Sequence, residues 1–307
     1  MHLEGNKQNN WGYIDVLALE IVIGVLLNIF IMYIALYDFG IAKTMSNSFK
    51  ILLCLSISNI LFGILMALGF VNDSFSLGMF TTTYTTYIYI YILLFSVSSC
   101  AWHTATLAFF YFLKVCHFKL QCFVWMKRKI SAAVPWMLCF GLLVSMLSSV
   151  SFISLPEFYN NATNTNPSLM TVLKQSISQF INVSIFVTVV PFLVISITTA
   201  STVVTLKKHG HRMKNSQTSD NTHVKSYQKV VSRLTQSMIF YVIFYAAMLI
   251  SFFAVCAHLE SGFWLSLLMF SSFTPLQTVL LVVTNPRLKT ALMEIFSCVH
   301  VREMLSR

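Results

Sequence analysis

Long apolar stretches, separated by short polar segments, set the pattern of the 307-residue chain. A helix needs about 20 mostly apolar residues to cross the hydrocarbon core of a bilayer. Seven stretches meet this requirement, and their approximate bounds are 14–37, 49–71, 82–113, 130–155, 181–206, 236–258 and 263–284. The pattern predicts an all-α membrane protein in which residues 1–307 form one domain, a bundle of seven transmembrane helices.

The end of the chain has a different periodicity. After Pro286, apolar residues recur at intervals of three or four, at Leu288, Leu292, Ile295, Phe296 and Val299. This spacing predicts a short amphipathic helix that lies on the inner leaflet. Between the sixth and seventh stretches stand Glu260, Ser261 and Gly262. We interpret them as a link between two spans, because one long helix would place Glu260 inside the membrane.

Composition agrees with a membrane protein. The chain is 57% hydrophobic and 10% charged, whereas a soluble domain is about 45–50% apolar and about 25% charged. The net charge of +10 could indicate a nucleic-acid partner, but the basic residues lie in short segments between apolar stretches. Such charges set topology and contact anionic membrane lipids, so no nucleic-acid partner is predicted.

The basic residues also predict the orientation. All Lys and Arg residues except Lys7 and Lys174 lie in the segments that follow spans one, three, five and seven. Because basic loops stay in the cytoplasm, the N-terminus is expected outside the cell, in a multi-pass protein of the plasma membrane. Asn161, in the sequence Asn161-Ala-Thr163 of the longest outer loop, is then the predicted glycosylation site.

A few polar residues interrupt the apolar spans. Glu20 lies one to two turns into span one, where it either meets a polar partner or reaches back to the outer surface. Asn28 and Asn59 lie in the middle of spans one and two and are expected to form hydrogen bonds between helices. Prolines also interrupt three spans, and the resulting kinks can be hinges or static bends: Pro135, Pro191 and Pro275.

Nothing in the sequence predicts an enzyme. HExxH and GxSxG motifs, paired carboxylates inside the spans, and Cys/His spacings for a metal are all missing, so no catalytic residue, cofactor or metal is predicted. A transporter or channel remains an alternative, although a transporter usually shows paired repeats or several buried charges. An opsin is excluded because the last span has no lysine.

Aromatic residues are concentrated in the outer halves of several spans. Such a lining suits small, mostly apolar ligands with a few polar anchors, although ordinary helix packing and an interfacial aromatic belt would give a similar pattern. The residues are Tyr84, Tyr87, Tyr89, Tyr91 and Phe95 in span three, Tyr245, Met248 and Phe252 in span six, and Trp264, Leu267 and Phe270 in span seven.

Four motifs occur in a characteristic order and spacing. They are Trp102-His-Thr-Ala-Thr-Leu107 with Phe110-Tyr-Phe-Leu-Lys114, then Phe123-Val-Trp-Met-Lys-Arg-Lys-Ile130, then Leu206-Lys-Lys-His209 with Met213, and Asn285-Pro-Arg-Leu-Lys289. Over nearly its whole length the chain thereby resembles the type 2 taste receptors, the bitter taste receptor family of G-protein-coupled receptors. The D/ERY and CWxP motifs of rhodopsin-like receptors are missing, which agrees with this resemblance.

The chain also departs from the family pattern. Asn59 replaces a common arginine of span two, Gln277-Thr278 stands where the family has His-Ser, and Leu93 stands where a tryptophan is frequent. These departures favour a divergent, non-mammalian member. Among receptors, the nearest alternative is the vomeronasal type 1 pheromone receptor family.

The resemblance implies a chemosensory function. A small bitter molecule would enter from outside, between spans three, five, six and seven, and the inner face would activate a heterotrimeric G protein of the gustducin-like or Gi class. The expected ligand-binding residues are Tyr89, Leu93, Ser96, Val97, Tyr245, Met248, Trp264, Leu267 and Phe270. The expected switch and coupling residues are Tyr111, Lys114, Lys207, His209 and Lys289.

Overall fold

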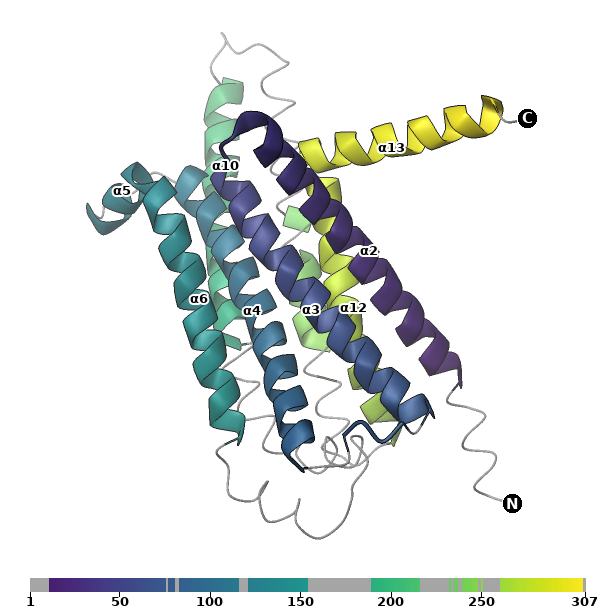
Figure 1. Ribbon diagram of the computed structural model, residues 1–307. Coiled ribbons are helices and arrows are strands. Elements are labelled where there is room, and N and C mark those ends of the chain that lie inside the picture. The colour runs from purple at the N-terminus through teal and green to yellow at the C-terminus, as the bar shows by residue number, and fades with distance from the viewer. Residues whose placement is uncertain are drawn as a thin grey trace.

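The computed structural model describes residues 11–75, 77–80, 83–115, 121–153, 189–215, 232, 235–236, 239–247, 250 and 260–305. Six long helices run side by side as a bundle (Figure 1): α2 (Trp11–Ala42), α3 (Asn47–Phe75), α4 (Thr83–Val115), α6 (Ile130–Ile153), α10 (Val190–Asn215) and α12 (Glu260–Thr284). All six are long and apolar enough to cross a membrane. The predicted all-α membrane fold is therefore confirmed.

The helices cover the predicted spans to different extents. Residues 239–247, within the predicted sixth span, are helical, whereas positions 248–249 and 251–258 of that span lie outside the described residues. The fifth span was predicted to begin at residue 181, and positions 181–188 also lie outside them. The third span was predicted to cover residues 82–113. The 33 residues of α4 extend roughly 50 Å at 1.5 Å per residue, well beyond a hydrocarbon core of about 30 Å.

Two further helices lie at one end of the bundle. The predicted C-terminal helix is present as α13 (Pro286–Leu305), and it projects sideways from the bundle (Figure 1). The short α5 (Gln121–Arg128) lies at the same end and was not predicted. We call this end the α13 end, and the other, where α2 and α4 begin, the far end.

The central helix of the bundle is α4, which packs against α3, α6 and α10, while α2 packs between α3 and α12. Glycine allows close approach between these helices. A Cβ atom on Gly63 of α3 would lie 2.7 Å from Val25 Cγ2 of α2, and one on Gly24 of α2 would lie 3.4 Å from Pro275 Cδ of α12. Replacing Gly63 by any larger residue would therefore force the Val25 side chain or the backbone of α2 to shift.

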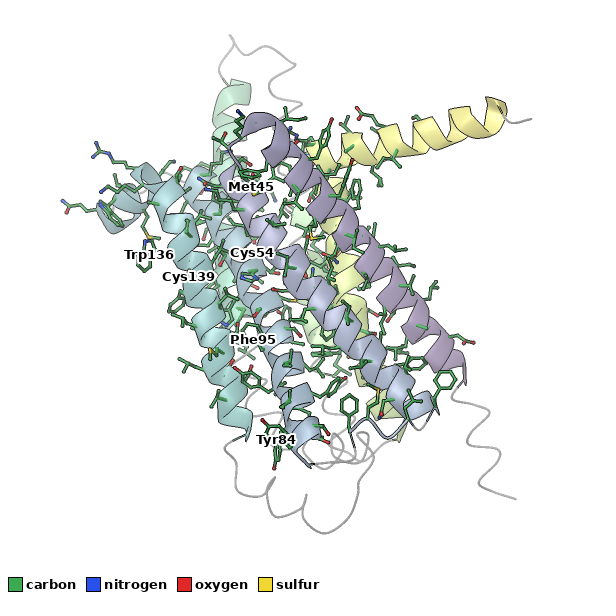
Figure 2. All side chains as sticks on the ribbon, viewed as in Figure 1. Met45, Cys54, Tyr84, Phe95, Trp136 and Cys139 are labelled. Carbon is green, nitrogen blue, oxygen red and sulfur yellow. The ribbon has the colours of Figure 1, made fainter. Side chains whose placement is uncertain are left out.

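Large apolar side chains are exposed on the outer faces of the bundle. Trp136 and Leu143 of α6 are 78% and 60% exposed, and Leu19 and Leu26 of α2 are each 60% exposed. Trp136 and Cys139 lie on the outer side of α6 (Figure 2). In water such surfaces would associate, whereas lipid chains solvate them at no cost. The exposed faces thus support the membrane location that the helix lengths indicate.

Candidate functional site

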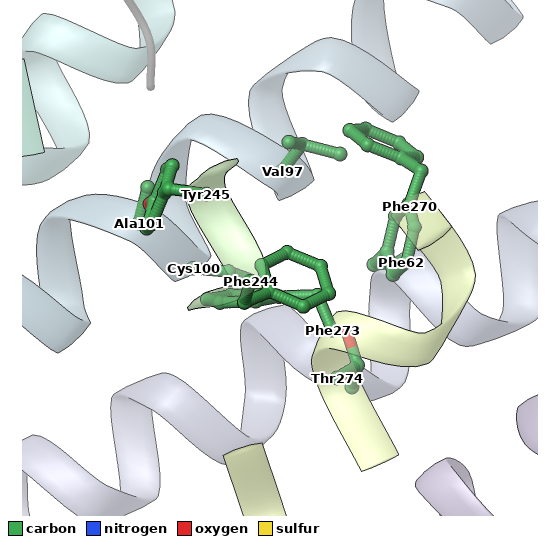
Figure 3. Close-up of a pocket in the computed structure, with 9 residues that line it drawn as sticks. All are labelled: Phe62, Val97, Cys100, Ala101, Phe244, Tyr245, Phe270, Phe273 and Thr274. Atoms are coloured by element: carbon green, nitrogen blue, oxygen red, sulfur yellow. The ribbon is translucent and has the colours of Figure 1, made fainter. Parts of the chain in front are cut away.

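A small cavity lies inside the bundle between α3, α4, the helical segment 239–247 and α12 (Figure 3). Apart from the Tyr245 hydroxyl and Thr274, the side chains that surround it are apolar, and five of them are aromatic. The lining residues are Phe62, Val97, Cys100, Ala101, Phe244, Tyr245, Phe270, Phe273 and Thr274.

Aromatic rings from different helices close this cavity. The rings of Phe62 and Phe270 meet edge to face with centroids 5.4 Å apart, and those of Phe244 and Phe273 lie 4.9 Å apart. Tyr245 also packs on Phe192 of α10 at 4.3 Å. The space left is about 30 Å³, roughly the volume of one water molecule in the liquid, whereas small-molecule sites measure about 300–1,000 Å³. The rings must separate before a ligand of ordinary size can enter.

Three of the residues expected to bind ligand, Val97, Tyr245 and Phe270, meet at this cavity. Two others, Tyr89 and Ser96, point their hydroxyls into the packing, because Tyr89 donates to Leu65 O (2.9 Å) and Ser96 to Leu93 O (2.7 Å).

Leu93 and Leu267, two more of the expected ligand residues, lie apart from the cavity lining. Leu93 is buried, and Leu267 is half-buried, in the apolar cluster of the far half of the bundle. Met248 and the side chain of Trp264 lie outside the described residues.

Sequence reasoning missed several lining residues, and a signal existed for some of them. Phe273 and Thr274 follow Phe270 by three and four positions, so they share its face of α12, and Phe244 precedes Tyr245 directly. Phe62 was missed because it belongs to the second span, and only spans three, five, six and seven were expected to contact ligand.

A layer of buried polar side chains crosses the bundle on the α13 side of the cavity. Asn59 of α3 donates to Asn28 Oδ1 of α2 (3.1 Å), and Asn28 Nδ2 in turn donates to Thr278 Oγ1 of α12 (2.9 Å). The predicted hydrogen bonds of Asn28 and Asn59 between helices are thereby confirmed. Gln277 Nε2 of α12 donates to Thr104 Oγ1 of α4, which completes a link among four helices.

The polar layer is hydrogen-bonded directly to the cavity lining. Thr104 Oγ1 donates to Cys100 O, and Thr278 Oγ1 donates to Thr274 O, each at 2.7 Å. Both acceptors belong to residues that line the cavity. Within one helical turn, the same two hydroxyls therefore join the cavity residues to the α4–α12 and α2–α12 contacts.

The same layer also contains buried polar atoms that lack a partner. His103 Nδ1 lies 3.2 Å from Ser58 Oγ, but His103 Nε2 and Asn59 Oδ1 are buried without a hydrogen bond among the residues that the structure describes. An unpaired buried polar group costs free energy, so an arrangement of these helices that pairs such atoms would be favoured.

Glu20 joins α2 to α12 nearer the far end. It accepts hydrogen bonds from Ser271 Oγ (2.6 Å) and Ser272 Oγ (2.5 Å). Of the two sequence interpretations, a polar partner inside the bundle is the one the structure shows. The two serines satisfy a carboxylate that would otherwise be costly within the membrane.

The expected coupling residues lie toward the α13 end. Tyr111 is half-buried against the apolar cluster at this end, while Lys114, Lys207 and Lys289 are exposed. His209 belongs to α10, and its side chain lies outside the described residues. A nearby contact between α2 and α13 was not predicted: Arg287 is 2.5 Å from Asp38 and 5.6 Å from the centre of the Phe49 ring.

Comparison of the sequence with known proteins identifies similar receptors. A family model described as taste receptor protein (TAS2R) matches residues 8–300. Taste receptor type 2 member 39 of Homo sapiens is 26% identical over 287 residues, which cover 90% of this chain and 83% of that receptor. Taste receptor type 2 member 4 of Gorilla gorilla gorilla is 24% identical over 280 residues, which cover 87% of this chain and 91% of that receptor.

These matches confirm the resemblance that the motifs indicated. The family is a class of receptors rather than of enzymes, and its fold is a bundle of seven transmembrane helices. The helices described above and the helical segment 239–247 fit that fold. Since the family model covers most of the sequence, this chain belongs to the type 2 taste receptor family of chemosensory receptors.

Proposed function

We propose that this receptor binds a small, mostly apolar bitter molecule in the aromatic cavity and signals through the polar layer to a heterotrimeric G protein. The observation that carries the proposal is the direct hydrogen bonding of Thr104 and Thr278 to the cavity residues Cys100 and Thr274. Ligand binding activates only if the ligand prefers one helix arrangement to another. In the closed arrangement the cavity is too small, so the ligand selects an arrangement in which the rings are apart.

The distribution of basic residues supports one orientation of the receptor in the membrane. The described basic residues Lys43, Lys50, Lys114 and Lys127–Lys129 flank the ends of helices at the α13 end, as do Lys207, Lys208, Arg287 and Lys289. Basic segments remain in the cytoplasm. We therefore place the N-terminus outside the cell, in the plasma membrane, with the far end open to extracellular ligand. Asn161, outside the described residues, remains our candidate for glycosylation.

The ligand-binding residues divide into two groups. Val97, Tyr245 and Phe270 contact ligand in the cavity, together with Phe62, Phe244, Phe273 and Thr274. The other expected residues belong to the entry path between the cavity and the far end, where apolar and aromatic side chains take up the ligand from the outer surface. They are Tyr89, Leu93, Ser96, Met248, Trp264 and Leu267.

The G protein binds at the α13 end. Exposed Lys114, Lys207 and Lys289 provide positive charge for the acidic groups of the partner, while His209 and the half-buried Tyr111 act in the switch. Charged surfaces of opposite sign raise association rates and select partners. A gustducin-like or Gi-class protein is the partner we propose, from the resemblance to the family.

A calcium assay in cells tests the proposal. The full-length receptor is expressed with a promiscuous G protein and exposed to a panel of bitter compounds. At least one compound should raise calcium, and the response should vanish when the G protein is omitted. A compound-dependent ion or solute flux that persists without any G protein would instead support the transporter or channel alternative and would contradict the proposal.

A further inference from the structure

A large groove opens on the outer side of the bundle, between α4 and α6. It measures about 630 Å³, within the range of small-molecule sites, about 300–1,000 Å³. Small residues leave this space, because Ala105 of α4 and Ala132 and Ala133 of α6 face it. Bulky rings flank it, including Trp102 and Trp136. The groove is separate from the ligand cavity, and none of its lining residues lines that cavity.

The lining of this groove matches a hydrocarbon chain along most of its length. Its side chains are Ala, Met, Val, Phe and Trp, with Thr106 and Lys129 as the exceptions. Trp136, at 78% exposure, stands on the outer side of α6 beside the groove (Figure 2). Aromatic residues of this kind are enriched where acyl chains meet headgroups.

The end of the groove nearest α5 is positively charged. Lys129 lines it, with Nζ 5.6 Å from the centre of the Trp125 ring. The backbone fixes this position, because Lys129 N donates to Trp125 O (3.0 Å) and Lys129 O accepts from Ala133 N (2.9 Å). Lys127 and Arg128 precede it in the chain, and no lining residue is acidic. Among the described lining residues, an anion at this end would meet only positive charge.

We propose that this groove binds one anionic phospholipid of the cytoplasmic leaflet, with an acyl chain between α4 and α6 and the phosphate at Lys129. The positive charge at one end of the groove complements the anionic headgroup of such a lipid, and the apolar lining beyond it complements the acyl chain. Basic pockets between transmembrane helices on the cytoplasmic side are known to hold acidic headgroups. The choice of leaflet rests on the orientation proposed above, whereas the choice of lipid rests on the groove alone.

Native mass spectrometry of the purified full-length receptor tests the lipid directly. In detergent micelles that contain either palmitoyl-oleoyl phosphatidylserine or the matching phosphatidylcholine, the wild-type receptor should retain phosphatidylserine several-fold more. Micelles have no sidedness, so a wrong orientation, or a failure of the receptor to signal, would leave this result unchanged. Equal retention of the two lipids by the wild type would overturn the proposal.

Two variants with matched controls locate the site. Lys129→Gln should reduce phosphatidylserine retention to the level of phosphatidylcholine, whereas Lys208→Gln, which removes an exposed charge of α10 outside the groove, should keep the preference. Ala133→Phe fills the groove and should lower retention of both lipids, whereas Leu143→Phe on the same helix should not. An unchanged preference for phosphatidylserine in Lys129→Gln would show that the phosphate does not bind at Lys129 and would overturn the proposal.

Discussion

Gln277 of α12 donates a hydrogen bond from Nε2 to Thr104 Oγ1 of α4, one helical turn from the cavity. Both side chains are buried, at 0% and 2% exposure, and Thr104 Oγ1 also donates to Cys100 O in the cavity wall. This single hydroxyl therefore connects the proposed agonist site to the contact between α4 and α12. Its loss should affect both stability and signalling.

Thr104→Val removes the hydroxyl at nearly constant volume. It should lower the free energy of unfolding by about 1 kcal/mol, because Gln277 Nε2 loses its partner in the bundle, and it should change basal signalling. Thermal unfolding in detergent measures the change in stability, and the calcium signal of cells without ligand measures the change in basal signalling. The double variant Thr104→Val/Gln277→Met should lose less stability than the two single variants added together, since it removes the Gln277 donor that Thr104→Val alone leaves unpaired. Strict additivity would refute the coupling.

The second prediction tests whether agonists bind in the aromatic cavity. Val97→Phe adds a ring to a space of about 30 Å³ and should weaken the potency of any agonist at least tenfold, because the ligand and the new ring compete for one volume. Phe273→Ala should enlarge the cavity and favour bulkier agonists. Dose–response curves of the calcium signal over the compound panel measure both effects.

Leu276→Ala is the matched control for these cavity variants. Leu276 lies on α12 close to Phe273 and is 48% exposed, so its truncation should leave the agonist dose–response unchanged. Cell-surface staining of each variant separates a loss of binding from a loss of expression. If Val97→Phe reached the surface and kept its potency for every agonist, the cavity would not be the ligand site.

The apolar pattern was sufficient to predict the six long helices, because a span needs an uninterrupted apolar length that can be counted along the sequence. The same reasoning predicted the bonds of Asn28 and Asn59, since an amide in hydrocarbon must find a partner. It could not say that Asn28 would pair with both Asn59 and Thr278. Those pairs depend on the rotation of each helix about its own axis, which side-chain packing sets.

The site was harder to predict than the fold for the same reason. An aromatic residue such as Tyr89 can face a cavity or a neighbouring helix with no change in the pattern of the sequence. Here its hydroxyl meets a carbonyl of α3. The groove beside Trp136 could not be predicted either. It forms where small alanines of two helices face each other, and the distance between two helices cannot be read from the sequence.

His209 offers a third prediction, at the cytoplasmic end of the proposed signalling path. The motif Leu206-Lys-Lys-His209 led us to place it in the switch, and the structure places it within α10. His209→Ala should change basal activity or the maximal response more than agonist potency. Nucleotide exchange on a purified G protein measures the first two, and the concentration of half-maximal response measures the third. A variant equal to wild type in all three would remove His209 from the site.

The contact between Asp38 and Arg287 gives the last prediction. The Arg287 side chain is 64% exposed and Asp38 14% exposed, with 2.5 Å between Arg287 Nη2 and Asp38 Oδ1. Because the Arg287 side chain is largely exposed to solvent, the pair contributes only about 0–1 kcal/mol to stability, so Asp38→Asn should scarcely change the melting temperature. The pair nevertheless joins α2 to the start of α13, beside the surface proposed for the G protein, and its loss should alter coupling efficiency.

The exchanged variant Asp38→Arg/Arg287→Asp should restore coupling toward wild type, and each single replacement should not. Because the exchange preserves attraction but reverses both charges, a double variant as defective as the single ones would show that the individual side chains, rather than their pairing, act in coupling.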